Sequence, residues 1–144
     1  MIPGICVAIH TRKFHKMPGE DEELVNPGMY GRAICQYLQD NLREADHDIP
    51  WFCNEDWGWW IEVKGLAIPL GLTVYCRPDE AGNVHDYAVM SSVTEDKVWS
   101  WRKLTKVIAV DRVASVNRIM SDVFALFSKD REVERVSRND DFPF

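Results

Sequence analysis

Four segments with the character of β-strands follow one another in the middle of the chain, between two segments with the periodicity of helices. The predicted strands cover residues 49–53, 57–64, 66–77 and 84–93. Consecutive strands with short connections pair in antiparallel fashion, because a parallel pair requires a long crossover. The turn-forming sequence of residues 78–83 makes the last pair a β-hairpin. This order restricts the chain to a mainly antiparallel sheet.

Two amphipathic helices are predicted on either side of this run of strands. The first covers residues 27–45, where Asn26 is suited to cap the free N–H groups and Pro27 is tolerated in the first turn. The second covers residues 111–129 and begins at Asp111. Apolar residues recur in each at helical spacing and form one stripe that has to be buried. The stripe of the first helix consists of Tyr30, Ile34, Leu38 and Leu42.

Two further strands are predicted outside the helices, over residues 5–12 and 132–137, and residues 98–110 fit either a strand or a helix. Strands grouped in this way favour a sheet with the helices on one side. We therefore predict a single domain over residues 1–144 of the α+β class. It has two layers, with a mainly antiparallel sheet of five to six strands and two main helices on one face, in the order β-α-β-β-β-β-α-β.

Three irregular segments add detail to this prediction. Residues 11–25 are expected to form an exposed loop, and the acidic residues 20–23 within it are expected to cap the N-terminus of the first helix. Pro69 has no N–H to donate, so its strand is expected at an edge of the sheet or with a bulge there. The last residues, 138–144, either fray or dock their two Phe rings on the body of the protein.

The charge of the chain restricts its partners. It has 17 Lys and Arg against 23 Asp and Glu, a net charge of −6, which disfavours a nucleic acid or an anionic membrane as a partner. No apolar stretch approaches the ~20 residues of a membrane-spanning helix, and the first residues lack the features of a signal peptide. We therefore expect a cytoplasmic protein that binds neither nucleic acid nor membrane, while its oligomeric state stays open.

The cysteines and histidines form no metal-binding or catalytic motif. The four cysteines, at positions 6, 35, 53 and 76, include no CxxC pair and lie among apolar residues, which is typical of reduced buried thiols. No HxH, HExxH or calcium-loop pattern occurs, and no Gly-rich phosphate loop. Spacing indicates neither a Cys–His site nor a specific pair of carboxylates, so we name no catalytic residue, metal ligand or cofactor.

The sequence Glu55–Trp60 is the centre of the candidate binding site. It places two acids directly before three tryptophans, of which Trp60 is expected on the opposite face of the strand from Trp57 and Trp59. Tryptophan needs both burial and a partner for its N–H, so such a cluster either anchors a core or lines a binding surface. Both interpretations stay open. The candidate binding residues are Trp51, Glu55, Asp56, Trp57, Trp59, Trp60 and Tyr75.

Two motifs, Leu24–Gly31 and Glu55–Trp59, resemble those of small bacterial cytosolic proteins of unassigned function. In these proteins a helix start of the form N-P-G-x-Y-G is followed by a strand with an acidic residue, Trp, Gly and an aromatic residue. The entry into the last helix at Val110–Arg112 is also similar. The resemblance covers most of the chain. It implies a compact α+β domain from a bacterial cytosol or a mobile element, and it brings no activity and no catalytic residues with it.

Three functions are compatible with these features. We favour a non-enzymatic interaction domain, of an inhibitor or immunity type, that uses aromatic and acidic residues on an uncovered sheet face to hold a basic protein partner. The first alternative is a small-molecule-binding domain with a pocket between sheet and helices, near Trp57, Trp59 and Tyr75. The second is a hydrolase or transferase of a type that the sequence does not reveal.

Overall fold

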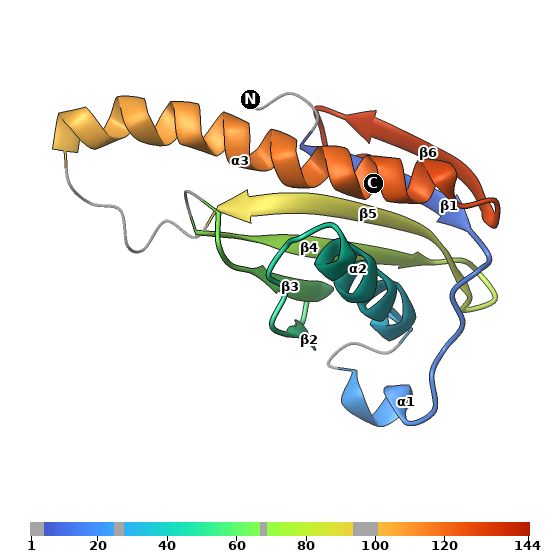
Figure 1. The fold of residues 1–144 in the computed structure, drawn as a ribbon. Coiled ribbons are helices and arrows are strands. Elements are labelled where there is room, and N and C mark those ends of the chain that lie inside the picture. Colours follow the sequence, from blue (N-terminus) through green and yellow to red (C-terminus); the bar gives the residue numbers. More distant parts are fainter. Residues whose placement is uncertain (1–4, 25–27, 67–68, 94–100) are drawn as a thin grey trace.

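The computed structural model describes residues 5–24, 28–66, 69–93 and 101–144, and for residues 93 and 101–112 it describes the backbone alone. The strands and long helices follow one another along the chain in the predicted order, with one additional short helix before the first long one (Figure 1). The elements are β1 (Cys6–Thr11), α1 (Glu20–Glu23), α2 (Arg32–Glu44), β2 (Phe52–Asn54), β3 (Trp59–Val63), β4 (Leu70–Pro78), β5 (Val84–Val93), α3 (Trp101–Lys129) and β6 (Val133–Asn139).

The strands form one sheet in the order β2-β3-β4-β5-β1-β6, in which every neighbouring pair is antiparallel. The α+β class and the order of the elements are therefore confirmed. The connection from β5 through α3 to β6 places the last strand beside β1 rather than beside β5. The first and last strands of the chain thus lie next to each other in the sheet, with Ile9 opposite Val136.

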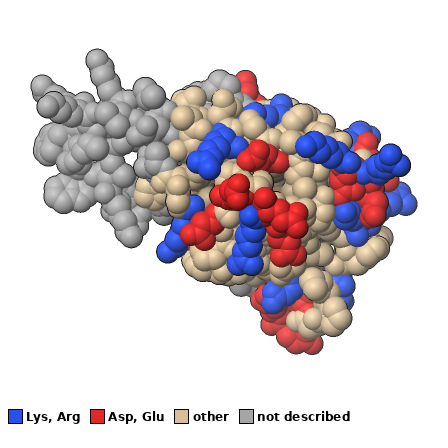
Figure 2. Space-filling view, in the orientation of Figure 1, with Lys and Arg blue, Asp and Glu red and all other residues tan. Residues whose placement is uncertain are grey.

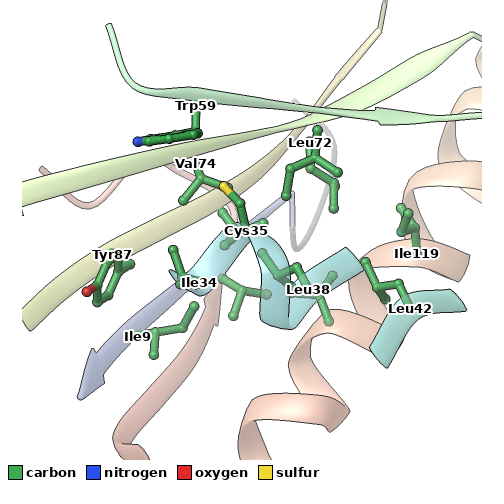
Figure 3. Packing of buried hydrophobic residues seen from close by; sticks show 14 of the residues in the cluster. Ile9, Ile34, Cys35, Leu38, Leu42, Trp59, Leu72, Val74, Tyr87 and Ile119 are labelled. Atoms are coloured by element: carbon green, nitrogen blue, oxygen red, sulfur yellow. The ribbon is translucent and has the colours of Figure 1, made fainter. Parts of the chain in front are cut away.

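Both long helices, α2 and α3, lie on the same side of the sheet (Figure 1). Strand alternation sends every second side chain toward them, and these side chains are apolar along the central strands. Figure 3 shows how side chains of α2 interlock with side chains from the sheet. Each large side chain buried here stabilises the fold by about 1.5–3 kcal/mol. The largest fully buried ones are Trp59, Tyr87, Phe127, Ile34, Leu38, Leu42, Ile49, Ile61, Leu70, Leu72, Ile119 and Met120.

Helix α2 begins at Arg32, five residues later than the sequence predicts. Gly28 has a positive φ of 87°, which is a turn conformation and not a helical one. The predicted cap at Asn26 and Pro27 lies outside the described residues. The N-terminus is capped instead by the carboxylate of Glu20, whose Oε2 accepts hydrogen bonds from the backbone N–H groups of Gly31 (2.8 Å) and Arg32 (3.1 Å). The expectation that the upstream acids cap this helix is therefore confirmed.

The acidic run is helical rather than the expected loop, although Asp21, Glu22 and Glu23 are exposed as expected. It forms the single turn α1, and Glu20 is 1% exposed. Its Oε1 accepts a third hydrogen bond, from the backbone N–H of Met17 at 2.9 Å. A buried carboxylate is tolerated here because its two oxygens are satisfied by three N–H donors and face the positive end of the α2 dipole.

Strand β4 is central, between β3 and β5, although Pro69 is expected to place it at an edge or to cause a bulge. This expectation is wrong because the strand begins at Leu70. A proline directly before a strand removes no hydrogen bond from the ladder. The irregularity of β4 lies at its other end, between Arg77 and Pro78.

Helix α3 begins at Trp101, so the ambiguous segment is helical from there on, and residues 98–100 lie outside the described part of the chain. Asp111 is therefore inside a helix of 29 residues and does not cap one. The sequence from Trp101 to Val110 contains no Gly or Pro, so nothing in it stops the helix.

Candidate functional site

Trp59 belongs to the core of the protein. It lies on the helix-covered face of β3 and is 0% exposed (Figure 3). Its indole N–H donates to the carbonyl oxygen of Met29 at 3.0 Å, so the ring is buried and its N–H still has a hydrogen-bond partner. Gly31 packs against the ring so closely that a Cβ there would lie 2.5 Å from Nε1 and 2.8 Å from the Sγ of Cys76. Trp59 is therefore not available to a ligand, contrary to its place among the candidate binding residues.

Trp57 lies in the turn between β2 and β3 rather than on the strand. The turn is closed by a hydrogen bond of 2.7 Å from the N–H of Glu55 to the carbonyl oxygen of Gly58. Gly58 has a φ of 157°, and a Cβ there would lie 2.5 Å from the carbonyl oxygen of Val74. Only glycine fits this close approach of two backbones. Because the turn breaks the alternation of the strand, Trp57 does not follow Trp59 to the covered side.

The ring of Trp57 packs on Tyr75, with 5.4 Å between the ring centroids. Tyr75 follows Val74, which is opposite Trp59 in the register, so Tyr75 points away from the helices. The expectation that Trp57 and Trp59 share a face is therefore wrong. Trp57 and Tyr75 both lie on the side of the sheet that no helix among the described residues covers, and both are partly buried.

Trp60 lies on this uncovered face, on the opposite side of the strand from Trp59 as predicted. Its partly exposed ring covers Gly71 on the neighbouring strand, where any Cβ would clash with it. The indole N–H donates to Oε1 of Glu62 at 3.3 Å. A glycine without a side chain leaves a gap in the sheet surface, and a ring from the next strand fills it. Trp60 thus shields the sheet and still exposes part of its ring.

The end of the chain returns across the uncovered face. Phe142 packs on Tyr75 with 4.7 Å between centroids and on Phe144 with 5.4 Å. The guanidinium of Arg77 lies 4.7 Å from the centre of the Phe144 ring. The rings therefore dock and do not fray, although Phe142 and Phe144 are 42% and 39% exposed. The only signal for them in the sequence is the pair of Phe residues around a proline in a polar tail.

We define the aromatic row as Trp57, Tyr75, Phe142 and Phe144, which contact one another in this order on the uncovered face. The acids predicted for the site lie at its Trp57 end, where Glu55 and Asp56 are exposed. Trp51 is 46% exposed, and its carbonyl oxygen accepts from the N–H of Glu62 at 3.0 Å. The row combines ring surface with nearby carboxylates, an arrangement suited to a cationic side chain.

A histidine between two carboxylates lies on the same face, where sequence analysis expects no site. The Nδ1 of His10 lies 2.6 Å from Asp86, and its Nε2 lies 3.1 Å from Glu134. Arg77 lies 3.6 Å from the second oxygen of Asp86. Burial acts to raise the pKa of Asp86, but His10 and Arg77 outweigh it and hold that pKa below its ordinary value. This cluster joins four neighbouring strands, β4, β5, β1 and β6, and only their register brings it together.

The thiols are held in the protonated form. Burial raises the pKa of Cys6 to about 11, and that of Cys35 and Cys76 well above the ordinary value. Cys53 is partly exposed, but burial and its hydrogen bond to Glu55 raise its pKa to about 11. A protonated thiol is a poor nucleophile and a poor metal ligand. This favours the interpretation of the cysteines as reduced structural residues.

Within residues 5–24, 28–66, 69–93 and 101–144, no three His, Cys, Asp or Glu side chains are arranged to hold a metal ion. Nor does any helix of this described part have the length and the apolar character needed to cross a membrane.

Comparison with protein-family models, with curated protein sequences and with solved structures finds no match for the chain. The resemblance to small bacterial proteins therefore stays a prediction.

Proposed function

We propose that the protein is a non-enzymatic interaction domain that binds a basic protein partner on the uncovered face of its sheet. The observation that carries this proposal is the aromatic row, because its four rings, each in contact with the next, are partly exposed on the sheet face that no helix of the described part of the chain covers. Large partly exposed rings are enriched at the centres of protein interfaces. In this proposal the protein acts in the cytosol as an inhibitor or immunity-type protein, and its partner is a protein of the same compartment.

Charge supports a basic partner. The chain carries a net charge of −6, and the acids beside the row, Glu55 and Asp56, are exposed. Glu62 adds a carboxylate next to Trp60 on the same face. A partner of opposite charge associates faster, and its Arg side chains gain both from carboxylates and from ring faces. The contact of Arg77 with Phe144 gives a local example of a guanidinium on a ring of this face.

The helix side offers less to a partner. Figure 2 shows Lys and Arg interspersed with Asp and Glu over this side of the molecule. Mixed charges of this kind are typical of a solvated surface. Val113, which is 46% exposed on α3, provides a matched control position on that side.

The proposal is tested by affinity capture with three versions of the protein: wild type, the double variant Trp57→Ala/Trp60→Ala, and Val113→Ala. Thermal unfolding first verifies that all three are folded. A partner with a net positive charge is expected with wild type and with Val113→Ala, and not with the double variant. The purified partner should then bind the double variant at least about tenfold more weakly and should lose affinity as salt rises. A partner retained equally by all three versions would contradict the proposed surface.

A further inference from the structure

We propose that a second site, on the helix side of the sheet, binds a small organic anion with a flat apolar body. It is a cavity of about 580 Å³ where the segment after β1, the start of α2 and the turn between β4 and β5 meet. This volume lies within the range of pockets that hold small ligands. The proposal does not rest on the interaction surface, because no member of the aromatic row lines the cavity.

The polar lining of the cavity is basic. Arg12, His15, Lys16 and His85 all line it, and among the described lining residues none is acidic. In a chain with more acids than bases, a lining of one sign is a local feature and not a consequence of composition. Cationic groups that converge on a cavity raise the local concentration of anions and hold them by charge-assisted hydrogen bonds. The ligand therefore carries a negative charge.

The floor and walls of the cavity are aromatic and aliphatic. Tyr87 and Ile34 are fully buried beneath it, and Phe14 meets the Tyr87 ring edge-on at 5.8 Å between centroids. Tyr30 forms part of the wall, with the ammonium group of Lys16 at 5.1 Å from its ring centre. A flat apolar group fits between such rings, so an inorganic ion alone would leave this surface unused.

The carboxylates that already contact these bases do not line the cavity. Asp79 lies 3.7 Å from His85, Glu134 lies 4.0 Å from Arg12, and Asp21 pairs with Lys16. Each of these acids is exposed, and exposed pairs contribute little to stability, so a bound anion can share their bases.

The side chain of His15 and the backbone N–H groups at the start of α2 are two further places where the charge of the ligand could be recognised. Within the described part of the chain, His15 has no charged partner. The N–H groups of Gly31 and Arg32 are already bonded to Glu20, so the helix end is occupied. Recognition of the anion therefore depends on the basic side chains and not on the helix N-terminus.

The probes for a test are phenyl phosphate and benzoate, which share a flat ring and differ in the anion. Benzyl alcohol serves as the neutral analogue, and inorganic phosphate as the anion without a ring. Binding is followed by amide chemical shifts and by calorimetry on the full chain. We expect one or both aryl anions to bind and to shift resonances of Lys16, Tyr30 and His85. Which of the two binds more tightly identifies the ligand as a phosphate ester or a carboxylate.

The variant Lys16→Gln/His85→Gln should weaken this binding by at least about tenfold, because it removes two of the four basic groups. The matched control Lys129→Gln removes an exposed charge at the end of α3 and should leave affinity unchanged. Binding of benzyl alcohol as tight as that of the aryl anions would overturn the proposal, as would equal binding of inorganic phosphate. Failure of both aryl anions to shift the cavity residues at millimolar concentration would do the same.

Discussion

The indole N–H of Trp59 donates to the carbonyl oxygen of Met29, 3.0 Å away and thirty positions earlier in the chain. This bond joins the segment before α2 to the beginning of β3. Gly31 completes the junction because its missing side chain leaves room for the indole ring. Met29 and Gly31 of the first sequence motif and Trp59 of the second therefore meet in one packing unit, which holds the start of α2 against the sheet.

Replacement of Gly31 by Ala should destabilise the protein. The new Cβ would lie 2.5 Å from Nε1 of Trp59 and 2.6 Å from its Cδ1, and overpacking of this kind costs about 1–3 kcal/mol. Urea denaturation measures the loss, and tryptophan fluorescence reports the displaced ring. The control Gly82→Ala meets no atom within 4 Å, so it should cost about 1 kcal/mol from its positive φ without any change in fluorescence. Equal fluorescence changes in both variants would contradict the packing argument.

Trp59 and Trp60 are neighbours in sequence but should differ in their contribution to stability. Trp59→Ala empties a fully buried site and removes a hydrogen bond, so we expect a loss of about 3–5 kcal/mol. Trp60→Ala removes a partly exposed ring, so we expect a loss of about 1–2 kcal/mol. The free energy of unfolding of each variant is compared with that of wild type. If Trp60→Ala lost more than about 3 kcal/mol, that ring would count as core.

Substitution of Glu20 by Gln should loosen the start of α2. The carboxylate accepts bonds from three backbone N–H groups, those of Met17, Gly31 and Arg32. An amide has only one acceptor oxygen, so part of this set is lost, at a cost of about 1–3 kcal/mol. Hydrogen exchange should become faster at Gly31 and Arg32. The exposed neighbour Glu22 provides the control, since Glu22→Gln should change neither stability nor exchange.

Asp130 should make the stability of the protein depend on pH in the acid range. Burial acts to raise its pKa, but hydrogen bonds from Lys13 and Tyr37 and from the backbone of Glu132 outweigh it and lower the pKa below the ordinary value. Because the pKa is lower in the folded state, the ionised carboxylate stabilises the protein at any pH above the unfolded-state pKa near 4. This stabilisation is lost as the pH falls through the folded-state pKa.

The variant Asp130→Asn tests this contribution. At pH 7 it should be less stable than wild type by about 1–3 kcal/mol, because it removes the charge that accepts these bonds. The difference should begin to shrink near pH 4 and should vanish only once the pH has fallen through the lowered folded-state pKa, because the wild-type carboxylate is then neutralised in the folded state as well. A difference that stayed constant from pH 7 to acid pH would rule out an ionised Asp130 as its cause. Urea denaturation at a series of pH values provides the measurement.

Cys53 should react slowly with thiol reagents although it is partly exposed. With its pKa at about 11, about one molecule in a thousand carries a thiolate at pH 8. Reaction with a disulfide reagent should therefore be slower than that of free cysteine by about two orders of magnitude. The variant Glu55→Gln removes the carboxylate that accepts from the thiol at 3.5 Å, so its reaction should be faster. A rate like that of free cysteine in the wild type would contradict the raised pKa.

Much of the fold follows from patterns that are local in the sequence. The apolar stripe of α2, with Ile34, Leu38 and Leu42 all buried, is read from helical spacing alone. The pairing of β2, β3, β4 and β5 follows from turns between consecutive strands, but the places of β1 beside β5 and of β6 beside β1 do not. Val133 and Val136 are three positions apart, and both pack against the core because the register of β6 on β1 shifts between His10 and Thr11. Local sequence patterns predict the candidate site less well than they predict the fold. Trp57 leaves the alternation because Gly58 closes a turn, and the sequence does not reveal whether a Trp-Gly pair lies in a strand or a turn.

The sequence by itself determined the class of the fold, since hydrophobic periodicity is a property of residues a few positions apart. Only the tertiary structure decided which tryptophans are core and which are surface, because that depends on the path of the chain around β3. It also decided that Glu20 caps α2, that the terminal Phe rings dock on Tyr75 and Arg77, and that bases converge on one cavity. Each of these contacts joins residues distant in sequence, and no local pattern encodes a distance between them.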